Sequence, residues 1–140
     1  MSFEALSAAL AEWPGHRLLT VMALDAARGV NRRVWSSRPD IWPPGGEKPL
    51  PRDSELYRMV VEQGLPRLLD GADAIRAAFA DHALILAAGC EAAVNLPVRC
   101  AGRTIGAVNL LHGQGHYAAF DLPRMAVLAD AAAPLLLAQV

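Results

Sequence analysis

Two asparagines, Asn95 and Asn109, lie inside the most apolar segments of the chain and are the first candidates for binding chemistry. A buried side-chain amide must find hydrogen-bond partners in the protein or in a ligand. A three-residue loop between their segments would place the two amides diagonally on one face, and a two-residue turn would place them on opposite faces. The sequence leaves both registers open. It also leaves open the alternative that these amides only bond to backbone loops.

The two cysteines, Cys90 and Cys100, are the candidates for thiol chemistry. A thiolate at Cys90 could act as a nucleophile, although a free cysteine is more often a small buried hydrophobic residue. Cys100 lies in a turn beside Arg99 and Arg103, and we expect it to be the more exposed thiol. With residues 91–99 extended at about 3.3 Å each, the two sulfurs would lie roughly 30 Å apart, too far for a disulfide.

Aromatic and histidine side chains supply the remaining candidates. Trp42 and Tyr57 lie in or just after a proline-rich segment and could wall a pocket, or could simply pack that segment onto the body. His112 and His116 are four residues apart, but Gly113 and Gly115 exclude a helix between them. We therefore predict no metal site there.

The element that must position these residues is residues 91–112. Two apolar, β-rich runs flank a short glycine-bearing turn, which predicts a β-hairpin. Both runs are apolar at nearly every position rather than at alternate ones, so both faces of the hairpin should be covered. We expect it in the middle of an antiparallel sheet of about five to six strands.

The remaining elements follow from periodicity and from helix start and stop signals. Residues 38–52 hold five prolines and two glycines and predict an ordered surface loop, and residues 82–88 are apolar without a clear period. Asp53 or Ser54 can cap one helix, Asp70 can begin another, and Asp121 can cap a last helix that Pro134 should bend. The predicted helices cover 1–14, 53–63, 70–81 and 121–139, and the predicted strands cover 17–24 and 30–37 besides the hairpin. The order predicts an α+β fold with terminal helices on one face of the sheet and short helices and loops on the other.

Composition restricts the class of protein. The chain has 140 residues, 54% hydrophobic and 19% charged, which predicts a single folded domain over residues 1–140. The formal net charge is -1 without a basic run, so we predict no nucleic-acid partner. The N-terminus lacks the features of a secretory signal, and no apolar run reaches the roughly 20 residues needed to span a bilayer. We therefore predict a cytoplasmic protein with no membrane partner.

At this point the chain resembles a GAF domain. The resemblance is carried by the strand pair 18–24 and 30–37, by Asp81-His82, by Gly89-Cys90-Glu91, and by the runs 95–98 and 106–112. It implies an N-terminal helix over residues 1–14 and a GAF core over 17–139 that includes the C-terminal helix. It also implies a homodimer through the N- and C-terminal helices and an unidentified small-molecule ligand on the opposite side of the sheet.

The resemblance implies that Asp81, His82 and Glu91 cluster near one edge of the sheet, either as ligand contacts or a proton relay, or as a helix-terminal histidine and two solvated acids. The full set of predicted ligand-binding residues is Trp42, Tyr57, Asp81, His82, Cys90, Glu91, Asn95, Asn109 and His112. The chain lacks the signature of cyclic-nucleotide GAF domains, and neither cysteine precedes a histidine as in bilin-carrying members. Both ligand classes are therefore disfavoured, and the sequence leaves any cofactor unknown.

The sequence leaves three functions open. The first is a small-molecule-binding sensory domain without catalytic residues, which is the function we expect. The second is a thiol-dependent reductase resembling free methionine-R-sulfoxide reductase, with Cys90 as nucleophile; this family uses resolving cysteines upstream, which the chain lacks. The third is a ligand-free dimerisation module.

Overall fold

The computed structural model describes residues 1–139 and confirms the α+β class. Six strands form one antiparallel sheet in the order β3-β2-β1-β6-β5-β4. The strands are β1 (Leu18–Asp25), β2 (Val30–Ser36), β3 (Glu47–Pro49), β4 (Arg67–Asp70), β5 (Ala92–Cys100) and β6 (Arg103–His112).

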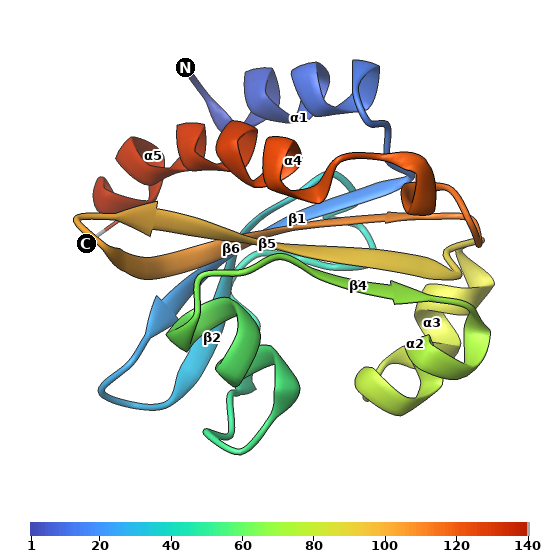
Figure 1. The fold of residues 1–140 in the computed structure, drawn as a ribbon, viewed down its shortest axis with the longest axis horizontal. Helices are drawn as coiled ribbons and strands as arrows, with labels where there is room; N and C mark the ends of the chain where they lie inside the picture. The colour runs from blue at the N-terminus through green and yellow to red at the C-terminus, as the bar shows by residue number, and fades with distance from the viewer. Residues whose placement is uncertain (140) are drawn as a thin grey trace.

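Helices cover both faces of this sheet, as predicted (Figure 1). One side carries α1 (Phe3–Glu12), α4 (Leu122–Ala129) and α5 (Ala133–Leu137), with the short turns η2 (Tyr117–Ala119) and η3 (Asp130–Ala132). The other side carries the π-helical turn η1 (Tyr57–Glu62), α2 (Ala72–Ala78) and α3 (His82–Ala87). We refer to these two sides as the terminal-helix side and the inner-helix side.

The β5–β6 hairpin lies inside the sheet with both faces buried. Val94, Leu96 and Val98 pack into the apolar cluster on the terminal-helix side. Ala93, one position out of phase, packs into the cluster on the inner-helix side. Because strand side chains alternate between faces, Asn95 also points toward the inner helices. The prediction that the hairpin is apolar at nearly every position because both of its faces are buried is confirmed.

Short helices that begin at capping residues fix the terminal-helix side. Ser2 Oγ accepts from the backbone N–H of Ala5, and Asp121 Oδ1 accepts from that of Arg124, so both predicted N-termini have side-chain caps. Pro134 follows a break rather than a bend, because the last helix divides into α4, η3 and α5. No helix within residues 1–139 combines the length and the hydropathy needed to cross a membrane.

Local pattern alone gave the wrong element in three places on the inner-helix side. Residues 67–69, assigned no element, and Asp70, assigned to a helix, form β4, because they pair with β5 before Gly71 turns the chain at φ 105°. The next helix consequently begins at Ala72 and not at Asp70. The undefined segment after residue 81 is helix α3, and the proline-rich loop contains the edge strand β3, where Pro49 is tolerated.

Candidate functional site

A row of polar side chains crosses four neighbouring strands on the inner-helix side. Register places Arg67, Asn95, Asn109 and Thr20 directly opposite one another on β4, β5, β6 and β1. Arg67 Nε donates to Asn95 Oδ1 at 2.9 Å, and Asn95 Nδ2 donates to Asn109 Oδ1 at 2.9 Å. Asn109 Nδ2 then donates to Thr20 Oγ1 at 3.2 Å. The hydrogen bonds all run in one direction, which leaves the Thr20 hydroxyl proton free to donate.

A β-bulge brings the two asparagines onto the same face. The turn is the two-residue type, since Cys100 pairs with Arg103, and this turn alone would separate the amides. The register then shifts between Val98 and Arg99, so that Asn95 lies directly opposite Asn109. Because the bulge adds one residue to one strand, neither the predicted two-residue turn nor the predicted three-residue loop by itself accounts for the observed pairing of Asn95 with Asn109.

A cavity of about 370 Å³ lies over this row. Its floor comes from β1, β2, β5 and β6, and its walls come from α2, α3, η1 and residues 42–50. Leu18, Met22, Trp42 and Leu111 make much of the surface apolar. An apolar pocket with a few convergent polar groups has the usual composition of a small-molecule site.

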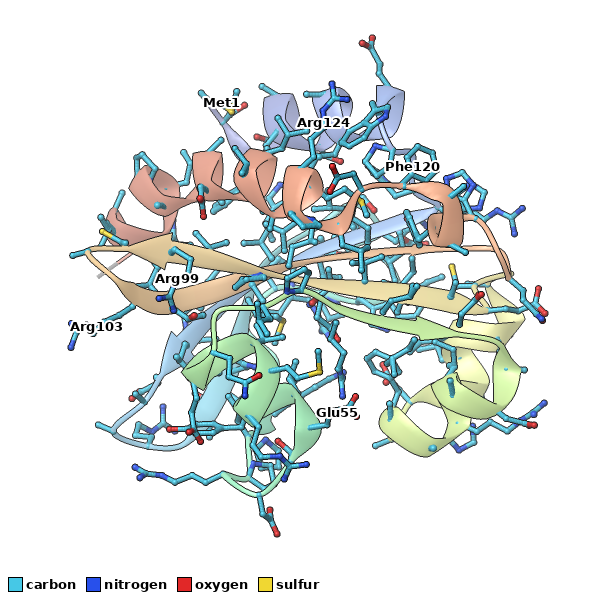
Figure 2. All side chains as sticks on the ribbon, viewed as in Figure 1. Met1, Glu55, Arg99, Arg103, Phe120 and Arg124 are labelled. Atoms are coloured by element: carbon cyan, nitrogen blue, oxygen red, sulfur yellow. The ribbon has the colours of Figure 1, made fainter. Side chains whose placement is uncertain are left out.

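Two buried arginines line the cavity: Arg67 forms the end of the polar row on β4, and Arg33 lies on β2, beyond the other end. Arg67 and Arg33 are each 8% exposed, and burial lowers the pKa of both guanidinium groups. Arg67 is paired, because it bonds Asn95 and lies 3.5 Å from a carboxylate oxygen of Glu55. Glu55 lies on the inner-helix side of the sheet (Figure 2).

Arg33 is held beneath the proline-rich loop and is incompletely paired. Its backbone N–H donates to Gly46 O at 2.9 Å, and its Nη1 donates to Pro43 O at 3.1 Å. Its Nε is buried without a hydrogen-bond partner among residues 1–139. A buried donor on a charged group normally has a partner, so this atom marks a place where an acceptor would be stabilised.

Asp81 is the one acidic residue that lines this cavity within the described chain. Trp42 Nε1 donates to its Oδ2 at 3.0 Å, and Lys48 Nζ lies 3.5 Å from its Oδ1. Burial would raise the pKa of Asp81, but the hydrogen bond from Trp42 and the charge of Lys48 outweigh it and lower that pKa. The carboxylate therefore stays ionised and ties the proline-rich loop to the start of α3.

Solved structures with this architecture are known. The second GAF domain of DevS from Mycobacterium smegmatis has a TM-score of 0.64 and 21% identity, covering 98% of this chain and 91% of that one. The GAF domain of a two-component sensor histidine kinase from Bacillus halodurans has a TM-score of 0.66 and 12% identity, covering 96% and 90%. The chain has the GAF fold. The predicted resemblance is thus confirmed for the fold.

One further structure with this fold is an enzyme. The type II free methionine-R-sulfoxide reductase from Thermoplasma acidophilum has a TM-score of 0.68 and 17% identity, covering 94% of this chain and 87% of that one. No protein-family model and no curated protein sequence matches the chain. At these identities the GAF fold is established and the function is not.

Four of the nine predicted site residues line the cavity of this GAF fold: Trp42, Asp81, Asn95 and Asn109. Sequence reasoning missed Arg33, Arg67, Thr20 and Lys48, which line it as well. A signal for Arg33 was present, because Arg32 and Arg33 are adjacent in a strand and alternation must direct one of them to each face. No such signal existed for Arg67, because its strand was not predicted.

Tyr57, His82, Glu91 and His112 lie outside the cavity lining. Tyr57 lines a surface groove of about 650 Å³. The β5–β6 turn borders this groove, and Arg99 and Arg103, on the two strands beside that turn, help to line it (Figure 2). His82 begins α3, and the Glu91 backbone N–H donates to His112 O at 2.9 Å. The cavity is thus lined by both predicted asparagines and by Trp42 and Asp81, but not by Glu91 and His112 at the strand ends.

His112 belongs to a separate aromatic cluster. Its ring stacks on that of His116 with centroids 3.6 Å apart, and His116 Nε2 lies 2.8 Å from Pro14 O. Burial and then the neighbouring His116 and Arg17 lower the pKa of His112, which favours the neutral ring. No group of three metal-ligating side chains occurs in the part of the chain that the structure describes.

Cys90 is also outside the cavity lining. It is 1% exposed and packs in the apolar cluster with Ile75, Ile85 and Leu111. Burial raises the pKa of its thiol, against the opposing charges of Arg17 and Arg38. A thiol that is buried and protonated is a poor nucleophile.

Proposed function

We propose that this protein is a sensory or regulatory domain that binds a small molecule in the cavity between the sheet and the inner helices. The observation that carries the proposal is the cavity itself, which combines an apolar surface with buried polar groups, one of which, Arg33 Nε, has no partner within residues 1–139. Ligand binding would give that group its acceptor. The GAF fold, found in a sensor histidine kinase, is consistent with such a role.

Native mass spectrometry and a thermal-shift screen test this proposal. We expect the purified protein to retain a small molecule, or to gain thermal stability from at least one member of a library of amino acids, nucleosides and organic acids. Trp42→Ala and Asn109→Leu, which change the cavity lining, should abolish the shift. His82→Ala serves as the matched control outside the lining. An equal response in the wild type and in both cavity variants would contradict the site.

The same proposal makes the protein a homodimer through its N- and C-terminal helices. Val127 on α4 is 68% exposed and Leu137 on α5 is 51% exposed, whereas Met125, Ala129 and Leu136 on the same two helices are buried. Burying such side chains against a second copy would remove apolar surface from water. We expect a dimer in light scattering and a monomer for Val127→Glu. A wild-type monomer at all accessible concentrations would contradict the dimer.

A thiol-dependent reductase with Cys90 as nucleophile is the alternative that the neighbouring reductase raises. The burial of Cys90 and the raised pKa of its thiol both disfavour it. Turnover of free methionine sulfoxide with a thiol reductant, lost in Cys90→Ser, would reinstate it.

A further inference from the structure

The two arginines in the cavity differ in what their guanidinium edges can still bind. Arg67 uses its Nε for Asn95, so its Nε–Nη2 edge is already engaged. Arg33 uses only Nη1, for Pro43 O, and its buried Nε has no partner within residues 1–139. The Nε–Nη2 edge of a guanidinium presents two parallel N–H groups that match the two oxygens of a carboxylate. Arg33 therefore has the geometry of a carboxylate anchor.

We propose that the cavity binds a small organic acid whose carboxylate pairs with this edge of Arg33 and whose apolar body lies against Met22, Trp42 and Leu111. This inference rests on the proposed function and names the ligand class of that same cavity. The side chains of Met22, Trp42 and Leu111 line the cavity together with Arg33. The volume of about 370 Å³ is near the small end of ligand pockets, which range from about 300 to 1,000 Å³, and this favours a compact acid.

The charges around the cavity favour an anion. Three basic side chains line it, Arg33, Lys48 and Arg67, against the single carboxylate of Asp81. Asp81 is bonded to Trp42 and paired with Lys48, and although its charge acts to raise the pKa of Arg33, it makes no hydrogen bond to Arg33 Nε. Removal from water strengthens the attraction between the guanidinium and an incoming carboxylate.

The polar row offers a second contact for the same ligand. Thr20 Oγ1 accepts from Asn109 Nδ2, which leaves the hydroxyl proton of Thr20 available as a donor at the cavity floor. An acid that also carries a carbonyl or hydroxyl oxygen can therefore accept from Thr20. This contact would let the cavity distinguish one organic acid from another, but the preference of the cavity for an anion does not depend on it.

Paired acids and amides test the ligand class by calorimetric titration of the full chain. The probes are phenylacetate, 4-methylpentanoate and octanoate, each with its primary amide, together with inorganic phosphate. We expect at least one acid to bind about tenfold more tightly than its amide, the ratio that one charge-assisted hydrogen bond supplies. Phosphate, which has no apolar body, should bind more weakly than that acid.

Variants of two adjacent arginines on β2 separate a specific anchor from general charge. Arg33→Met should weaken binding of the acid about tenfold or more and leave binding of the amide within about twofold. Arg32→Met is the matched control, because Arg32 lines the surface groove and not the cavity. If Arg33→Met fails to fold, Arg33→Lys carries the test, since it keeps the charge but loses the planar edge and should still weaken binding.

Several results would overturn the inference. Binding by none of the acids, unchanged affinity in the Arg33 variants, or phosphate binding as tightly as the acids would each reject it. Amides that bind as tightly as acids, with both lost in Trp42→Ala, would reject the organic acid but keep the proposed cavity. If the purified protein neither retains a ligand nor gains thermal stability from any library member, both the proposed small-molecule site and the proposed ligand class are rejected.

Discussion

Replacing Asn95 by leucine tests how much the polar row contributes to stability. Asn95 is 2% exposed, accepts from Arg67 Nε at 2.9 Å and donates to Asn109 Oδ1 at 2.9 Å. Leucine is similar in size, so the substitution removes both hydrogen bonds without creating a large cavity. The expected effect is therefore dominated by the polar groups that lose their partner.

The magnitude follows from what each partner loses. A hydrogen bond to a charged donor contributes about 1.5–3 kcal/mol, and Arg67 Nε is buried where water cannot easily replace Asn95. Asn109 borders the cavity, so solvent can replace its lost donor at a cost of at most about 1 kcal/mol. The apolar surface of leucine offsets about 1 kcal/mol of this loss. We expect a net loss of about 2 kcal/mol, or roughly 4–8 °C in Tm for a domain of this size.

Urea denaturation followed by far-ultraviolet circular dichroism measures this change. Asn31→Leu is the matched control, because Asn31 lines the same cavity from β2 but takes no part in the row. It should change the free energy of unfolding by less than about 0.5 kcal/mol. The double variant Arg67→Leu/Asn95→Leu should cost less than the sum of the two single changes. If Asn95→Leu is no less stable than Asn31→Leu, the row is not a stabilising network and our reasoning is wrong.

Three further predictions concern the thiols, a close backbone contact and acid stability. Ellman's reagent should label Cys100 rapidly and Cys90 only on unfolding, because Cys90 is 1% exposed; one fast thiol remaining in Cys100→Ser would contradict this. Gly106→Ala should lower stability by about 2 kcal/mol or more in urea, since the new Cβ would clash with the backbone carbonyl oxygen of Met22 and lie 2.7 Å from a Leu136 methyl carbon. Gly113→Ala would meet only a flexible arginine at 3.4 Å and should cost less. Because the pKa of His112 is lowered in the folded state, the unfolded state binds a proton on this histidine at higher pH than the folded state does. The free energy of unfolding should therefore fall as the pH drops below about 6.5 and through the folded-state pKa. If a His112→Gln variant lost stability with falling pH just as the wild type does, His112 would not be the group responsible.

The candidate site was only partly accessible from sequence. Asn95 and Asn109 could be identified because a polar residue inside an uninterrupted apolar run must be satisfied. Arg67 could not be placed, because the strand that carries it is four residues long and is formed by pairing with β5. Trp42 and Asp81 were recognised as candidates, but the bond between them joins residues 39 apart in the chain. Contacts between segments that far apart have no local pattern.

The sequence by itself determined the class of fold and the burial of the hairpin. Continuous apolar runs, helix caps, and apolar residues that recur every two or every 3.6 positions are local properties of the chain. They were enough to predict the hairpin, the first two strands and the terminal helices, but not β3, β4 or α3. Only the tertiary structure decided which polar side chains meet. The bulge between Val98 and Arg99 aligned Asn95 with Asn109, and the docking of residues 42–50 on β2 buried the guanidinium of Arg33. A one-residue shift moves a whole strand to the other face, so register and loop packing, which depend on distant partners, control the chemistry of the cavity.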